Sequence, residues 1–343
     1  VDTRGNHNLG VNHRVAGSIY GEVNLLKNLT FKSTWSMDYG IEESRGYSPI
    51  IQVYNPAGQT IDVLQNKEKM TQSKSTQYTA QGDNILTYNN TFDKKHNLTL
   101  MAGVTTNYVE YSSLDGMRST NIDKIYFNVG DNQDKWWLTS LGNDAASNQT
   151  DNTKLYQWRK STMSYLLRSL YNYDNKYLFN ASFRRDGSSA FYGTGNTWDN
   201  FYSFGGAWVM TQENFMANQK TINYLKLKAS WGKLGSENIG TNANTYYPTD
   251  PALTSSGGAV FGPNEDVISS YNSKYLTQGL KWEKTYSWEA GFEMMLLDNR
   301  LRFEPTYYSK RTKDIIVLLN TQGGAQNSLQ NLAEVENKGV EFT

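Results

Sequence analysis

The chain has 343 residues, with 33 Lys and Arg against 33 Asp and Glu, and its mean hydropathy is −0.67. Zero net charge argues against a nucleic-acid binder, which normally carries a basic excess. No stretch approaches the roughly 20 consecutive apolar residues of a transmembrane helix, so a helical membrane protein is excluded. Cysteine is absent, which excludes disulfides and thiolate metal sites.

A two-residue alternation is clear between Leu29 and Tyr39. The residues between the apolar ones are polar and include Lys32 and Asp38. Because successive side chains of a strand point to opposite faces, this pattern predicts a strand with one apolar and one polar face. The apolar face of this segment holds Leu29, Phe31, Trp35, Met37 and Tyr39.

The same pattern recurs along the chain in about ten segments, which pair into hairpins. Short turns rich in Asn and Asp join the two strands of most pairs, and a longer turn lies around 213–220. The predicted strand pairs are 18–26 with 29–39, 84–92 with 97–109, 161–173 with 177–186, 200–211 with 224–233, and 284–296 with 301–312. Long polar stretches separate the pairs and are predicted to be loops: 40–83, 110–160, 187–199, 234–283 and 313–337.

Strict alternation of short turns with long loops is typical of outer-membrane barrels, whose turns face the periplasm and whose loops face outward. The sequence therefore predicts an all-β fold, an antiparallel up-and-down transmembrane β-barrel. The alternative is a soluble antiparallel sheet with one wet face. Pro305 lies inside a predicted strand and lacks a backbone N–H, which predicts an irregularity there.

In each segment, every second residue lies on the same face of the strand, and we call such a set of alternate positions a parity. One parity of these segments is apolar, and we expect it to carry no charge. A Lys or Arg facing lipid near the midplane costs about 2–4 kcal/mol, whereas a charge facing a wet lumen costs little. The opposite parity also holds Leu166 and Leu170, which we expect to pack against something inside the barrel. The charged residues predicted to face the lumen are Lys226, Lys228, Glu289, Glu293, Arg302 and Glu304.

No motif for catalysis, a metal or a cofactor is found in the sequence. Glu289 and Glu293 lie four residues apart on one strand face, about 13 Å, which is wider than the usual spacing of glycosidase carboxylates. Trp136 and Trp137 in the 110–160 stretch are candidates for contact with a ligand or partner, because exposed aromatic rings stack on sugars. The alternative is packing against a neighbouring loop.

Four elements of the second half of the chain resemble SusC/RagA-type TonB-dependent transporters. The sequence departs from the usual pattern at Ala190, where Arg is common, and at Ala333, where Gly is common. The four elements are Phe183-Arg184-Arg185-Asp186-Gly187-Ser188-Ser189, Leu225-Lys226-Leu227-Lys228-Ala229-Ser230-Trp231-Gly232 with Gly235, the stretch from Gly279-Leu280-Lys281-Trp282-Glu283-Lys284-Thr285 to Asp314, and Glu334-Val335-Glu336-Asn337-Lys338-Gly339-Val340-Glu341.

The resemblance implies a barrel of about 22 strands around a plug domain, in the outer membrane of a Gram-negative bacterium. Residues 1–343 would then be about ten strands of that barrel domain, with the plug and the TonB-contacting segment outside them. Both ends of the sequence look cut, and the last residues look like a strand just beginning.

The resemblance also implies a function. It is nutrient import powered by the TonB complex, with no chemistry of its own, together with a SusD-like surface lipoprotein that captures an oligosaccharide or peptide. The alternatives are a passive outer-membrane porin and a soluble glycan-binding β protein.

Overall fold

The computed structural model describes residues 7–65, 67–121, 154–237, 239, 253–261, 266–273, 279–319 and 328–343. The chain divides into two compact units. The first consists of Val1–Ser18, Ser36–Ala80 and Tyr108–Arg159. The second consists of Ile19–Trp35, Gln81–Asn107 and Lys160–Thr343.

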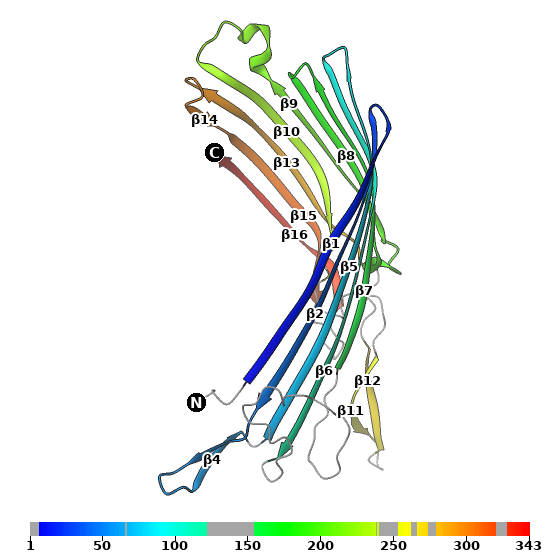
Figure 1. Cartoon of the computed structure of the whole chain (residues 1–343), viewed down its shortest axis with the longest axis vertical. Coiled ribbons are helices and arrows are strands. Elements are labelled where there is room, and N and C mark those ends of the chain that lie inside the picture. The colour runs from blue at the N-terminus through cyan, green and yellow to red at the C-terminus, as the bar shows by residue number, and fades with distance from the viewer. Residues whose placement is uncertain are drawn as a thin grey trace. The chain divides into compact units, whose positions relative to one another are not determined.

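The described residues are almost entirely strand, and consecutive long strands are hydrogen-bonded neighbours in the order β1-β2-β5-β6-β7-β8-β9-β10-β13-β15-β16 (Figure 1). This confirms the predicted antiparallel meander. The strands are β1 (His7–Leu26), β2 (Leu29–Ser48), β5 (Lys67–Phe92), β6 (His96–Asn121), β7 (Lys154–Tyr173), β8 (Tyr177–Ser188), β9 (Trp198–Val209), β10 (Ile222–Ser236), β13 (Glu283–Leu296), β14 (Leu301–Phe303), β15 (Pro305–Leu319) and β16 (Ser328–Phe342).

Helix is confined, among the described residues, to three-residue 3-10 turns. None of these helices is long and apolar enough to cross a membrane. The 3-10 turns are Ser189–Phe191, Met210–Gln212 and Asn214–Met216.

In the second unit the short turns lie together at one end of the strands, the upper end in Figure 1, which is called the turn end below; the opposite end is the loop end. Backbone hydrogen bonds join neighbouring turns: the amide of Asp174 donates to the carbonyl of Lys95 at 2.7 Å, and the amide of Val209 donates to that of Lys176 at 2.8 Å. Asp174 and Asn175 have φ of 52° and 56°. Asn and Asp tolerate this left-handed conformation, which explains why the sequence signals these turns.

The prediction of loops is wrong over most of 40–83 and, within 110–160, over the described residues 110–121 and 154–160. β2 continues to Ser48, and both β5 and β6 are 26 residues long. In the first unit the extended strands are paired by polar contacts: Lys74 lies 2.8 Å from Glu43, and the hydroxyl of Tyr47 donates to buried Glu68 at 2.7 Å. With polar residues on both faces, these stretches lose the alternation by which a strand is recognised.

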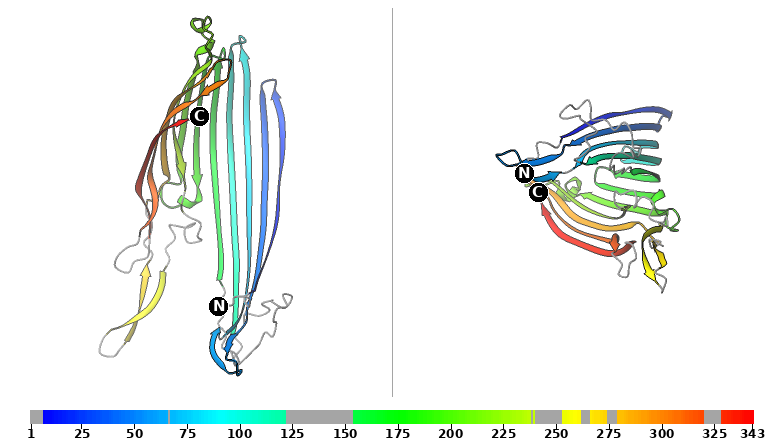
Figure 2. Two further views of the ribbon diagram at one scale, coloured as in Figure 1. Left: turned by 90° about the vertical axis from the view of Figure 1, so that its left-hand side faces the viewer. Right: turned by 90° about the horizontal axis from the view of Figure 1, so that it is seen from below.

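The predicted loops 40–83 and 234–283 also contain hairpins outside the main sheet. Two small hairpins form separate two-stranded sheets, β3 (Ile51–Tyr54) with β4 (Thr60–Gln65), and β11 (Leu253–Phe261) with β12 (Asp266–Ser273), yellow in Figure 2. The strand expected to be just beginning at the end of the sequence starts earlier, at Ser328, and pairs with β15.

The irregularity predicted at Pro305 is confirmed. The strand that follows the 297–300 turn is interrupted at Glu304, between β14 and β15. Gly291 of β13 lies opposite Thr306, and a Cβ at Gly291 would lie 2.4 Å from the Pro305 carbonyl oxygen. The backbones therefore approach closely beside the break, which only glycine allows.

A buried cluster lies at the loop end of the second unit. The Phe191 and Trp282 rings are 5.0 Å apart, and Phe201 packs edge-on against Trp282 at 5.7 Å. The Glu283 carboxylate accepts a hydrogen bond from the Ile316 amide at 2.8 Å. The apolar members of the cluster are Ala190, Phe191, Phe201, Ile239, Leu280, Trp282 and Ile316.

Candidate functional site

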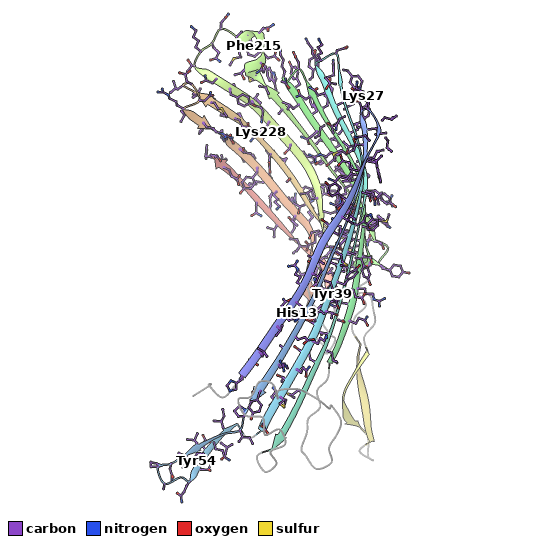
Figure 3. All side chains as sticks on the ribbon, in the orientation of Figure 1. His13, Lys27, Tyr39, Tyr54, Phe215 and Lys228 are labelled. Atoms are coloured by element: carbon purple, nitrogen blue, oxygen red, sulfur yellow. The ribbon has the colours of Figure 1, made fainter. Side chains whose placement is uncertain are left out.

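The charged face of β10 and β13 has ion pairs across the strands. Lys226 lies directly opposite Glu293, with a Nζ–Oε2 distance of 2.9 Å, and Lys228 reaches the other oxygen of the same carboxylate at 3.1 Å. Residues opposite each other in an antiparallel pair share a face. The alternation predicted from the sequence therefore brings these three side chains together; Lys228 is labelled on β10 in Figure 3.

The other three predicted lumen residues lie on the same strands. Arg302 lies opposite Met295, which shares a face of β13 with Glu293. Arg302 also forms an ion pair with Glu304 beside the strand break. Glu289 is exposed and lies between Ser230 of β10 and Tyr308 of β15. Within the described residues, Glu289 has no ion pair. The six residues thus form a mixed-charge face rather than a patch of one sign.

The opposite face of the same strands is apolar. Leu227 lies between Trp208 and Phe292, and its side chain is 39% exposed. Trp231 lies between Phe204 and Trp288 in the same way. A row of exposed, uncharged large side chains across several strands is what a lipid-facing wall requires.

The expectation of an uncharged apolar parity is wrong toward the loop end. Arg185, Lys233, Lys284 and Arg311 follow that parity in sequence. They are accommodated by local partners: buried Lys233 donates to Asp199 at 2.9 Å, and Arg311 pairs with Glu334. Alternation also lapses there, because adjacent Gly232 and Lys233 are both buried.

Leu166 and Leu170 lie on the polar parity, as predicted. Leu166 is opposite Arg184, and Leu170 is opposite Asn180. Both side chains are half-buried. What packs against them stays a prediction.

An aromatic row lies at the turn end, on the apolar face. Tyr177 stacks on Trp208 at 6.4 Å, and Trp208 contacts exposed Phe215 of the β9–β10 turn, labelled in Figure 3. Glu213 of that turn accepts hydrogen bonds from Tyr177 Oη at 2.7 Å and from Trp208 Nε1 at 3.2 Å. The bond from Tyr177, with those from Trp208 and Lys176, lowers the pKa of Glu213 below its usual range.

The buried loop-end cluster is the part of the site that sequence reasoning missed. Two of the four family-like elements meet there, since Ala190 and Phe191 directly follow one element and Leu280 and Trp282 belong to another. Asn331 ties the cluster to β16 by donating to the Lys281 carbonyl at 2.7 Å. The signal was present as apolar residues in otherwise polar stretches, at 190–191 and 280–282.

Trp136 and Trp137 lie outside the described residues, so their contact with a ligand or partner stays a prediction. In the part of the chain that the structure describes, no three His, Asp or Glu side chains group as a metal site would require. His96 instead hydrogen-bonds through Nδ1 to the hydroxyl of Tyr171 at 2.7 Å.

Comparison with known proteins places this wall in a family. Residues 2–343 match the family described as TonB dependent receptor-like, beta-barrel. The chain is 30% identical to TonB-dependent receptor P39 of Formosa agariphila over 94% of this chain and 28% of that protein. It is 33% identical to TonB-dependent receptor SusC of Bacteroides thetaiotaomicron over 55% of this chain and 19% of SusC.

Solved structures share the fold. The RagAB peptide importer in its closed-closed state superposes with a TM-score of 0.78 at 20% identity, covering 99% of this chain and 34% of that chain. The ferric-catecholate import receptor Fiu of E. coli K12 superposes with a TM-score of 0.52 at 11% identity. This chain therefore spans about a third of the RagAB chain and somewhat less of the P39 receptor.

Proposed function

Because the chain belongs to the TonB-dependent receptor β-barrel family, we propose that the whole protein is an active importer of the outer membrane, driven by TonB. The family is one of outer-membrane transporters and not of enzymes, so the alternative of a soluble glycan-binding protein is wrong. The match over residues 2–343 carries the proposal. This chain supplies wall strands of the barrel.

The charged face of β10, β13 and β14 is the lumen wall in this proposal. Lys226, Lys228 and Glu293 support it, because they are ion-paired on the side of the sheet away from Leu227 and Phe292. The charges on this face are mixed in sign. A wall without a field of one sign does not steer a polyanion, so strongly charged polyphosphates are not the expected cargo.

The cargo in this proposal is an oligosaccharide or a peptide, and a SusD-like surface lipoprotein covers the loops. The resemblance to SusC/RagA-type transporters supports both, and the 33% identity to SusC agrees with that resemblance. The composition fits such cargo: 24 Tyr and 9 Trp offer flat apolar faces and hydrogen-bond donors that suit sugars and peptide backbones.

Uptake measured in cells that express the full-length protein, with and without TonB, tests the energy source. Import should stop without TonB. Import that continues undiminished would show a passive porin instead. Purification of the barrel from native membranes should also bring down a lipoprotein. A barrel that always purifies alone would contradict the proposed lipoprotein partner but not the proposed TonB coupling.

A further inference from the structure

The backbone of β15 is distorted at one residue toward the loop end. Asp314 has φ of 58°, a left-handed conformation that residues other than glycine seldom adopt. Among the described residues, the other non-glycine residues with positive φ lie in the short turns 93–95, 174–176 and 297–300, so Asp314 is the one case inside a strand. Such a conformation costs free energy and persists only where its surroundings hold it, so it indicates a functional constraint.

The distortion belongs to a β-bulge. Between Thr312 and Ile315 the register of β15 shifts against β16, and β15 has one residue more there than its neighbour. A bulge of this kind bends its strand and re-aims a side chain. The Asp314 carboxylate contacts the segment 281–284, through which the stretch 234–283 joins β13.

The Asp314 carboxylate bridges two lysines of that segment. Its Oδ1 lies 2.9 Å from Lys281 Nζ, and its Oδ2 lies 3.9 Å from Lys284 Nζ. Lys284 lies directly opposite Lys313 in the strand register, and like charges in that position repel each other. Lys284 Nζ also lies 3.4 Å from Asp199. The bulge therefore brings a negative charge to a place where cations of neighbouring strands meet.

Backbone groups beside the bulge find their partners in the same segment. Asn331 Nδ2 donates to the Asp314 carbonyl at 2.6 Å and to the Lys281 carbonyl at 2.7 Å, and its Oδ1 accepts from the Lys281 amide at 3.0 Å. The Ile316 amide donates to the Glu283 carboxylate at 2.8 Å. Because residues 279–282 precede β13, side chains rather than a strand ladder attach them to the wall.

We propose that the Asp314 bulge is an electrostatic latch, loosened by salt, that holds the segment 279–284 on the wall. Glycine would adopt the left-handed conformation without strain, so the distortion serves the carboxylate rather than the backbone alone. The side chains of Lys281 and Asp314 are 41% and 28% exposed, and salt screens charges at such partly exposed sites. Ionic strength at the loop end therefore controls how firmly the stretch 234–283 is held where it returns to the wall. Neither TonB nor the cargo enters this inference.

Hydrogen exchange of the full-length protein in detergent, read by mass spectrometry, tests the latch. Asp314→Asn removes the charge and keeps a residue that tolerates positive φ. Asp298→Asn is the matched control, because Asp298 has φ of 55° in a short turn and no ion pair within the described part of the chain. Peptides covering 279–284 and 314–317 should exchange about threefold to fivefold faster in Asp314→Asn, and at the unmodified rate in the control.

The response to salt separates the latch from a merely structural role of Asp314. Raising the ionic strength from about 0.05 M to about 1 M should speed exchange of the same peptides in the unmodified protein. The increase should be much smaller in Asp314→Asn, because the Asp314 ion pairs are already lost. An equal salt response in the two proteins would overturn the proposal, as would equal exchange at low salt.

Lys281→Met tests the latch from its other side. It removes the partner charge and leaves the bulge intact, so it gives an answer even if Asp314→Asn fails to assemble. It should speed exchange of the 279–284 peptides as Asp314→Asn does, and the double variant should exchange no faster than either single variant. Effects that add in the double variant would show that the two residues act separately and would contradict the latch.

Discussion

Adjacent residues of β10 occupy opposite environments. Leu227 contributes to the apolar face between Trp208 and Phe292, while Lys228 shares the Glu293 carboxylate with Lys226. A substitution at either position therefore probes one face only. The two positions share the same strand and the same depth, which makes them controls for each other.

We expect Leu227→Arg to impair assembly into the membrane, because the new cation faces lipid at a cost of about 2–4 kcal/mol near the midplane. Lys228→Gln should be tolerated, because Lys226 still pairs with Glu293. The amount of folded protein in the outer membrane is compared for the two variants. Folded barrel is quantified as the protein that resists denaturation by detergent until the sample is heated. Equal damage from both substitutions would show that the two faces are wrongly assigned.

Sequence reasoning grouped these residues by face as the strand register does, but it could not pair them. Lys226 and Glu293 lie 67 positions apart by their residue numbers, across the long stretch 234–283. Alternation reveals the face of a side chain but not the register between strands that no short turn connects. The Lys226–Glu293 contact therefore became visible only in the structure.

Among the elements, the strand that follows the 297–300 turn shows how the local sequence determines a break in a strand. Pro305 cannot donate a ladder hydrogen bond, and the strand is broken at Glu304. On the neighbouring strand β13, Gly291 has no side chain, and this leaves room for the displaced backbone at Pro305. The pair forms one unit, although its members are 14 positions apart by number.

Replacing Gly291→Ala should destabilise the barrel by roughly 1–3 kcal/mol, because the new Cβ would overlap backbone that has no room to move. Gly40→Ala on β2 is the matched control, since a Cβ there meets nothing within 4 Å. Denaturant unfolding of the purified full-length protein in detergent gives both free energies. A similar loss of unfolding free energy in the two variants would show that the close approach at Gly291 does not matter for the strand break.

The extended strands were the elements that the sequence did not reveal. A membrane crossing needs about 9–11 residues of strand, whereas β5 and β6 have 26 residues each. Outside the bilayer neither face must be apolar, so stretches such as Glu42 to Arg45 show no alternation. Pairing in such regions comes from backbone bonds and polar pairs like Glu43 with Lys74, which single-sequence patterns do not encode.

For the whole molecule, membership of the family predicts the direction of the barrel in the membrane: short turns on the periplasmic side, and long strands and loops at the cell surface. The β3–β4 turn, with Ala57, and the β7–β8 turn, with Asn175, should lie on opposite sides. These 343 residues contain no cysteine, so an introduced Cys is the only thiol among them, and the unmodified full-length protein gives the labelling background. Single cysteines can therefore report the topology.

On intact cells, a membrane-impermeant maleimide should label Ala57→Cys and leave Asn175→Cys unlabelled. Both should react once the membranes are disrupted, which controls for buried thiols. Labelling of Asn175→Cys on intact cells would reverse the assigned orientation. This measurement does not involve TonB, so it stands apart from the uptake experiment.

Strict pairing of each long strand with its sequence neighbour also bears on how the wall is assembled. A hairpin closed by a tight turn can form locally and be added to the one before it. If the charged face lines the lumen as proposed, a slip of one residue in β10 would turn Lys226 and Lys228 toward lipid, at about 2–4 kcal/mol each near the midplane, and would expose Leu227 to water. The bilayer would therefore disfavour misaligned hairpins during assembly, even where their backbone hydrogen bonds are all formed.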